Sequence, residues 1–321
     1  MISSRNARQS ARICNLASSL GSLPTSASCR PFTSSQRCCA IPLAYARYDP
    51  PRSEKPPVVE YPVIILHGLF GNKMNWQAIA KKLKDKLRQS IICVDARNHG
   101  ESRHDPDNSY EAMSDDVEEL VHRLKIPKAI LVGHSMGGKV AMCTALRKPA
   151  EVDSLIVVDS APSQSPGLES FKRYISAMKA LDLSRDEKIP QLRGRAIKEF
   201  EENIPELMVR QFILTNLVEN KGKNEWRVNL EAIENNLNNI MEFPLFHNFY
   251  GGPVLFIAGD KSDYIGDKEM PEIRRLFPEV VIDKLPGGHW VHADNPKETI
   301  ASIVRFLKKR ETDDADAAQN L

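Results

Sequence analysis

Residues 131–140 read LVGHSMGGKV, and they match two motifs that belong to different folds. Read from its first glycine, the stretch nearly spells the phosphate-binding loop G-x-x-x-x-G-K-[ST], whose last residue supplies a hydroxyl to Mg²⁺. Val140 stands at that last position, and an apolar side chain cannot bind a metal ion. Centred on Ser135, the same stretch spells G-x-S-x-G, the strand-to-helix turn that exposes a nucleophilic serine. We therefore interpret it as a nucleophile elbow, with Lys139 as an exposed residue of the following helix.

The segments around the elbow predict an α/β fold. Short β-branched apolar runs recur along the chain, and most are followed by stretches with helical spacing. The predicted strands are 63–68, 91–100, 129–135, 155–162 and 254–260, and the predicted helices between them are 76–88, 113–124 and 136–148. Such runs are typical of strands buried on both faces. Their alternation with helices predicts a mostly parallel central sheet flanked by helices.

The domain organisation follows from where this alternation stops. Residues 164–250 have few strand-like runs and several helical patterns, so we expect a helical lid over the carboxyl edge of the sheet. A last helix at 296–310 completes a domain that spans residues 41–310. Residues 311–321 are acidic and lack apolar residues able to anchor them, which predicts a disordered tail.

The N-terminal segment has a different composition. Residues 1–40 are rich in Arg and Ser and contain no Asp or Glu, which is typical of a mitochondrial transit peptide. The chain carries 44 basic and 42 acidic residues, and without the six arginines of residues 1–48 the balance is 38 to 42. A mildly acidic body predicts no nucleic-acid partner.

Cysteine spacing and hydropathy exclude further classes. Cys93 and Cys143 are the cysteines beyond the N-terminal segment, and both lie in apolar runs, which predicts buried thiols. No zinc spacing or disulfide framework is present. No run approaches the roughly 18 apolar residues of a membrane span, so we expect no transmembrane segment.

A nucleophilic serine requires a base. His289 lies in LPGGHWVHAD (285–294), after the last apolar run and before the final helix, and this matches the chain order Ser, acid, His. Gly287 and Gly288 allow a loop there. His292 is the competitor, but it lies closer to the helix, so we assign it a structural role.

Two aspartates compete for the role of the acid, which orients the imidazole and stabilises its positive charge. In many such enzymes the acid follows the strand at 254–259, three residues beyond its glycine, but Ser262 stands there. Asp263 is its neighbour. Asp159 instead ends the strand after the elbow, at the same sheet edge, where a carboxylate is already half-buried. We favour Asp159 and retain Asp263 as the alternative.

The oxyanion that forms during acyl transfer requires N–H donors. The segment HGLFG (67–71) follows the strand at 63–66, where the partner loop of an oxyanion hole belongs. We predict the backbone N–H groups of Leu69 and Met136 as the pair of donors. His67 is expected to brace this loop.

Four ordered segments, HGLFGNKMNW, DARNHGES, GHSMGGK and GHWVHAD, together resemble the α/β-hydrolase superfamily. More narrowly, they resemble its mitochondrial esterase and lipase subgroup of the abhydrolase-domain protein eleven type, to which small bacterial esterases and yeast ethanol acetyltransferases are similar. The resemblance runs from about Pro62 to Leu307. Most hydrolases of this fold have Gly where Asn98 stands. In the subgroup the acid often follows the strand after the elbow, which implies Asp159, whereas relatives tend to lack an acid at Asp263.

These features predict a serine hydrolase of the mitochondrial matrix that cleaves short- to medium-chain acyl esters or thioesters through an acyl-enzyme. The chemistry requires no metal and no organic cofactor. One alternative is an alcohol acyltransferase, in which an alcohol takes the acyl group that acetyl-CoA supplies. Another is a hydrolase-fold binding protein without activity.

Overall fold

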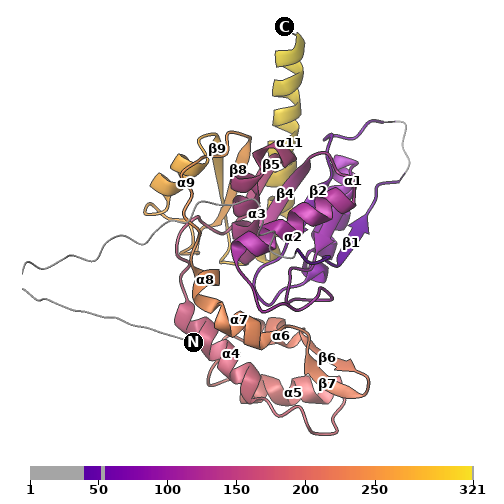
Figure 1. Cartoon of the computed structure of the whole chain (residues 1–321), viewed down its shortest axis with the longest axis vertical. Coiled ribbons are helices and arrows are strands. Elements are labelled where there is room, and N and C mark those ends of the chain that lie inside the picture. Colours follow the sequence, from indigo (N-terminus) through magenta and orange to yellow (C-terminus); the bar gives the residue numbers. More distant parts are fainter. Residues whose placement is uncertain (1–39, 52–54, 320–321) are drawn as a thin grey trace, which may run out of the picture. The chain divides into compact units, whose positions relative to one another are not determined.

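The computed structural model describes residues 40–51 and 55–319. The predicted transit peptide, residues 1–40, lies outside them except for Ala40. The central sheet has seven strands in the order β1-β3-β2-β4-β5-β8-β9, and Figure 1 shows helices packed around it. The strands are β1 (Tyr45–Tyr48), β2 (Val63–Leu66), β3 (Ile91–Val94), β4 (Ala129–His134), β5 (Val152–Val158), β8 (Val254–Gly259) and β9 (Val280–Leu285). β1 runs antiparallel to β3, and all the other neighbours are parallel. The predicted α/β fold is confirmed.

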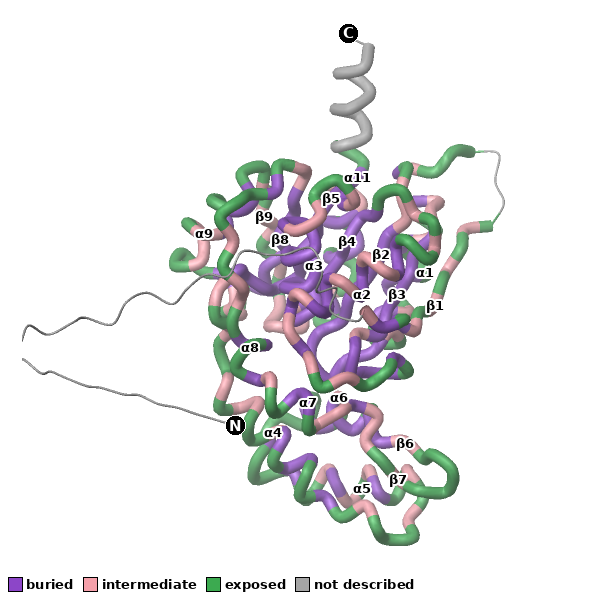
Figure 2. Tube along the Cα trace, in the orientation of Figure 1, coloured by how far each residue is buried: buried purple, intermediate pink, exposed green. Residues whose placement is uncertain are grey.

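Helices cover both faces of the sheet, which explains why its central strands are continuous apolar runs. One face packs against α1 (Gln77–Leu87) and α11 (Pro296–Gln319). The other packs against α2 (Tyr110–Arg123), α3 (Met136–Arg147) and α9 (Met270–Leu276). Figure 2 shows the central strands as the most buried part of the chain. The sheet is therefore a rigid support for the residues at its carboxyl edge.

The lid (residues 164–250) lies between β5 and β8 in the sequence. It contains α4 (Leu168–Ala180), α5 (Ile189–Glu199), α6 (Leu207–Leu214), α7 (Leu230–Asn235), α8 (Leu237–Met241), β6 (Leu217–Asn220) and β7 (Lys223–Trp226). The antiparallel β6–β7 hairpin was not predicted, because the lid was expected to be helical. Its turn is made by Lys221 and Gly222, both with positive φ, as a tight hairpin turn requires.

The C-terminal helix differs from the sequence expectation. We expected it to end near residue 310, but α11 continues to Gln319. Residues 311–319 contain three alanines and neither glycine nor proline, so nothing in their sequence stops a helix.

The two cysteines of the domain and the hydropathy of its helices were also considered in the sequence. Cys93 and Cys143 are free and buried, and burial raises the pKa of each thiol to about 12. Among the helices of residues 40–51 and 55–319, none has the length and hydropathy needed to cross a bilayer.

Candidate active site

Ser135 occupies the sharp turn between β4 and α3. Its φ of 52° and ψ of −119° lie in a region that side-chain-bearing residues rarely adopt. A Cβ on Gly133 would lie 2.1 Å from the carbonyl oxygen of Gly137, and a Cβ on Gly137 would lie 2.4 Å from that of Leu66. The G-x-S-x-G pattern therefore needs glycine on both sides of the serine for steric reasons.

His289 lies between Ser135 and Asp159 and is hydrogen-bonded to both. Its Nε2 accepts from the Ser135 hydroxyl at 3.0 Å, and its Nδ1–H donates to Asp159 Oδ2 at 2.8 Å. Ser135 directly follows β4 and Asp159 directly follows β5, two neighbouring parallel strands. His289 belongs to the loop between β9 and α10 (Val291–Asp294). The structure thus brings together three residues that are distant in the sequence.

Asp159, and not Asp263, contacts the imidazole. Its side chain is 0% exposed, and its Oδ1 accepts from the Gly259 N–H at 2.9 Å. Its Oδ2 also accepts from the Ser262 hydroxyl at 2.5 Å. Asp263 is exposed at the wall of the neighbouring cavity and makes no hydrogen bond with His289. Ser262, which stands in the usual place of the acid after β8, therefore donates a hydrogen bond to the acid that follows the neighbouring strand β5.

The loop that carries Leu69 lies directly beside the elbow. A Cβ on Gly68 would lie 3.2 Å from that of Ser135. Leu69 lines the cavity in front of the serine, and Met136 follows the serine at the first position of α3. Within the described chain, neither N–H donates to another protein group. Both are available to an oxygen atom of a bound substrate.

Two neutral histidines hold this loop. His67 Nε2 accepts from the Ala96 N–H at 3.0 Å, while its Nδ1–H donates to the Gly68 carbonyl at 2.8 Å. His99 Nε2 accepts from the Phe70 N–H at 3.2 Å. Burial lowers the pKa of His67 and lowers that of His99 to about 3, so both rings keep an acceptor nitrogen. His67 therefore braces the loop, as expected.

Asn98 connects the sheet to the lid. Its φ of 65° explains why Gly or Asn suits this position. Its side-chain oxygen accepts from the Asp105 N–H at 2.9 Å and from the Asn229 amide at 3.1 Å. Asn229 caps the start of the lid helix α7, so the contact with Asn98 holds that end of the helix in place.

His292 does not reach the serine. Its ring stacks on Trp76, with centroids 4.4 Å apart, and lies 4.3 Å from the ring of His134. His134 in turn donates from Nε2 to the His289 carbonyl at 2.9 Å. Burial lowers the pKa of His292 to about 3. The histidine has the structural role that the sequence suggested.

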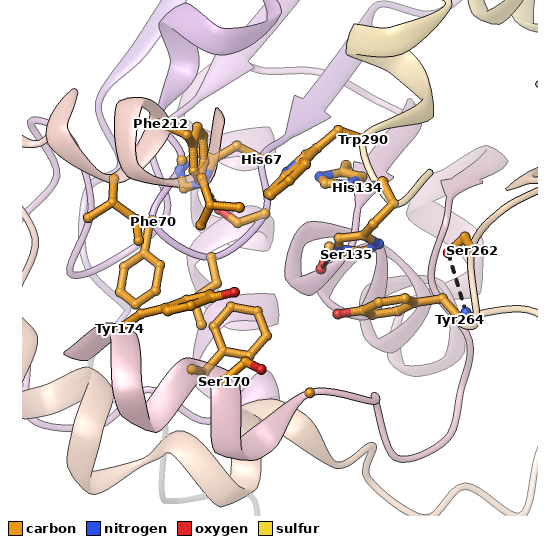
Figure 3. A pocket seen from close by; sticks show the side chains of 18 of the residues that line it. His67, Phe70, His134, Ser135, Ser170, Tyr174, Phe212, Ser262, Tyr264 and Trp290 are labelled. Atoms are coloured by element: carbon orange, nitrogen blue, oxygen red, sulfur yellow. Dashed lines mark hydrogen bonds between the residues drawn. The ribbon is translucent and has the colours of Figure 1, made fainter. Parts of the chain in front are cut away.

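Tyr264 is a site residue that the sequence interpretation missed. Its ring is stacked on the His289 imidazole, with centroids 3.7 Å apart and planes inclined by 15°. Its backbone N–H lies 3.4 Å from Ser262 Oγ, the contact drawn as a dashed line in Figure 3. A single aromatic residue in a polar loop carries no sequence signal of this kind.

A cavity of about 480 Å³ opens in front of Ser135, between the sheet edge and the lid. Its walls include the aromatic side chains Phe70, Phe171, Tyr174, Phe212, Tyr264 and Trp290. In Figure 3, the labelled side chains Tyr174 and Tyr264 point into it. Four lid aromatics pack against the core, and two of them, Phe171 and Phe212, also line the cavity; the other two are Trp226 and Phe246.

Lys139 is buried, which corrects the expectation of an exposed helix residue. It is 1% exposed, and its amine donates to the carbonyl oxygens of Met241 at 2.8 Å and Glu242 at 2.9 Å. The Met241 carbonyl also accepts from the Ser165 N–H at 2.7 Å. The lysine therefore fastens α3 to the point where the two ends of the lid meet. The partner carbonyls lie over 100 residues away, so helical spacing could not reveal them.

Side chains that could hold a metal lie outside this site. Among the described residues, the group that converges as metal ligands would is Glu118, His122 and Glu151. These residues lie on α2 and the short helix η2 (Pro149–Glu151), and none lines the cavity. The Lys148 amine already donates to Glu118 at 2.7 Å.

The chain is similar in sequence to known proteins. Residues 61–178 match the model of the alpha/beta hydrolase fold family. The chain is 46% identical to the sn-1-specific diacylglycerol lipase ABHD11 of Danio rerio over 77% of this chain and 78% of that protein. It is 35% identical to the probable alcohol acetyltransferase of Saccharomyces cerevisiae, over 78% of each chain.

A solved structure is also similar to most of this chain. The structure of a marine microorganism esterase superimposes with a TM-score of 0.76 at 35% identity, over 83% of this chain and 99% of that chain. The unmatched share is 17% of this chain, which is fewer residues than the lid contains, so the match includes at least part of the lid. The chain belongs to the α/β-hydrolase family and, within it, to the ABHD11-like group of lipases and esterases.

Proposed function

We propose that the protein is a serine carboxylesterase in which Ser135, His289 and Asp159 form a catalytic triad. The continuous hydrogen-bonded chain from the serine hydroxyl through the imidazole to a buried carboxylate carries this proposal. The serine also faces a cavity large enough for a small acyl ester.

The geometry supports a two-step reaction. His289 takes the proton of Ser135 as the serine oxygen attacks the acyl carbonyl, and Asp159 stabilises the imidazolium that forms. The N–H groups of Leu69 and Met136 are the proposed donors to the oxyanion. The imidazolium then protonates the leaving alcohol. In the second step His289 activates water, which releases the acid and restores the serine.

The proposed substrate is an ester with a short- to medium-chain acyl group. The cavity walls are mainly apolar, which favours binding of an uncharged acyl chain over binding of a charged substrate group. Relatives named as sn-1-specific diacylglycerol lipases suggest glycerolipid esters within this class. Comparing kcat/KM for p-nitrophenyl acetate, butyrate, octanoate and palmitate tests the limit, and highest activity on palmitate would contradict it.

The reactive serine can be tested directly. A fluorophosphonate probe should label the wild-type protein and should not label Ser135→Ala, because the probe requires an activated serine. Ester hydrolysis should fall to the background rate in the same variant. A folded wild-type protein that is not labelled and does not hydrolyse esters would support a binding protein without catalytic activity.

Acyl transfer to an alcohol is the second candidate. The similarity to the probable alcohol acetyltransferase of Saccharomyces cerevisiae favours it, because the same acyl-enzyme can react with an alcohol or with water. Purified protein should be incubated with acetyl-CoA, with and without ethanol. Ethyl acetate formation would indicate transfer, whereas acetate alone would indicate hydrolysis.

We also propose a mitochondrial matrix location. The Arg- and Ser-rich, acid-free composition of residues 1–40 supports it. A fusion of residues 1–40 to a fluorescent protein should enter mitochondria, and replacing its arginines by glutamine should abolish import. A fusion that stays outside mitochondria would refute the proposal.

A further inference from the structure

Tyr264 contacts both partners of the reactive hydrogen bond. Its ring lies almost parallel to the imidazole of His289 at 3.7 Å. Its hydroxyl faces Ser135, as the labelled side chains in Figure 3 show. Its backbone reaches Ser262, whose hydroxyl holds Asp159. One residue of the loop after β8 is therefore joined to all three members of the proposed triad.

The two rings have complementary electronic character when the imidazole is charged. An aromatic face carries a negative quadrupole and attracts a cation placed over it. In the proposed reaction His289 is positively charged while each tetrahedral intermediate exists. Burial and the nearby Asp159 carboxylate raise the pKa of Tyr264, so its ring is a neutral phenol throughout the working range.

We propose that Tyr264 is a positioning residue whose ring holds the His289 imidazole in line between Ser135 and Asp159 and stabilises its charged form. This inference rests on the proposed esterase function. The ring blocks rotation of the imidazole on one face, and the hydrogen bond of Nδ1 to Asp159 fixes its edge. Together these contacts leave Nε2 directed at the serine oxygen.

The other titratable groups around His289 are not expected to shift the pH profile of activity between pH 5 and 8. His134 lies 4.8 Å from it on β4, and His292 lies beyond His134 on α10. Burial lowers the pKa of His134 well below its ordinary value and that of His292 to about 3, so both rings stay neutral from pH 5 to 8. Asp159 faces the opposite ring nitrogen. A shift of the activity profile in this range therefore reports on His289.

The test separates the ring from its hydroxyl. Tyr264→Leu and Tyr264→Met remove the aromatic face, whereas Tyr264→Phe retains it. For the first two variants we expect kcat/KM for a p-nitrophenyl ester to fall roughly tenfold. We expect the acid limb of the profile to move to lower pH by about half a unit, because the charged imidazole loses its favourable contact. Tyr264→Phe should keep the limb at the wild-type pH.

Tyr174→Leu is the matched control. Tyr174 lines the same cavity, but its ring contacts that of Phe171. This variant should change KM and leave the acid limb in place. An acid limb unmoved in both Tyr264→Leu and Tyr264→Met would overturn the inference, as would an equal shift in Tyr264→Phe.

A second measurement separates this inference from the proposed function. Titration of the His289 ring signals by NMR reads the same protonation equilibrium without a substrate, with His289→Gln identifying the signals. Wild-type protein without esterase activity would refute the function. An unchanged His289 titration in Tyr264→Leu would refute the role of Tyr264, whatever the activity.

Discussion

At the scale of single residues, Asp159 shows that the acid bound to the histidine can follow β5 rather than β8. The carboxylate accepts hydrogen bonds from the Gly259 N–H, the Ser262 hydroxyl and His289. Three donors offset the cost of burying a negative charge. Ser262 fills the place from which an acid would otherwise extend, so a carboxylate there would meet Asp159.

The two candidate acids should differ strongly in their effect on turnover. Asp159→Asn should lower kcat roughly 10³- to 10⁴-fold, because the amide no longer stabilises the imidazolium or fixes its tautomer. Asp263→Asn should change kcat by less than about threefold, since an exposed charge contributes little. Steady-state kinetics on a p-nitrophenyl ester measures both, with circular dichroism as the control for folding. The opposite ranking would show that Asp263 moves to the histidine during catalysis.

The sequence revealed part of this site. The elbow, the late histidine and the HG loop carry strong patterns because glycine is needed where backbones approach closely, as at Gly133 and Gly137. The choice between Asp159 and Asp263 depended on which carboxylate faces the imidazole, and no spacing encodes that. Tyr264 and the burial of Lys139 also depend on contacts between distant segments.

At the scale of elements, α3 both supports the elbow and anchors the lid. Its first turn follows Ser135, and one turn later Lys139 reaches the end of α8. Tyr110 of α2 donates to the Ile240 carbonyl at 2.6 Å and fixes the same end. The last lid helix is therefore held by two side chains from two helices of the sheet domain.

The Lys139 contact should make stability depend on pH. Burial lowers the pKa of Lys139 to about 7, whereas an unfolded lysine titrates near 10.4. Between these values the unfolded chain binds more protons, so the free energy of unfolding rises with pH. Relative to Lys139→Met, the wild type should gain at most about 1.4 kcal/mol per pH unit from pH 7 to 10.

Urea unfolding of both proteins at several pH values measures this difference, because subtraction removes the titration of all other groups. A difference that is constant from pH 7 to 10 would show that Lys139 keeps its proton in the folded state. A Lys139→Arg variant is a useful comparison, since a guanidinium stays charged throughout and should show no such gain.

Some strands could be predicted from the sequence and others could not. β2, β4 and β8 are apolar runs buried on both faces, and their sequences identify them. β1 has four residues with alternating exposure, and β9 is only partly buried, so neither forms a continuous apolar run. The β6–β7 hairpin depends on a turn, Lys221–Gly222, inside a segment that otherwise has helical spacing. Edge strands and short hairpins take their stability from neighbours rather than from local pattern.

At the scale of the whole molecule, the segment before β2 completes the sheet domain. β1 pairs with β3, and the Ile41 N–H donates to Asp116 at 2.7 Å. Ile41 and Leu43 are buried. Asp116 also binds the buried Arg97 through two hydrogen bonds of 2.6 and 2.7 Å. Residues 41–48 are therefore part of the sheet domain.

Truncation can test this assignment. A chain that begins at Ala40 should have the thermal stability of the full chain. A chain that begins at Asp49 loses β1 and two buried aliphatic side chains, and its free energy of unfolding should fall by about 3–6 kcal/mol. Thermal unfolding of the three chains gives the comparison. Equal melting temperatures for the Ala40 and Asp49 chains would place the boundary after β1.

The shared carbonyl of Met241 has a consequence for how such proteins diversify. It accepts from Ser165 and from Lys139, so the chain leaves the sheet domain and returns to it at nearly one point. The residues between are a closed loop, and doubling the length of a flexible loop costs only about 0.6 kcal/mol of closure entropy. Insertions, deletions or whole replacements of this loop can therefore accumulate with little penalty to the scaffold that holds the reactive groups. New substrate preferences can arise in one part of the gene while the chemistry is inherited in another.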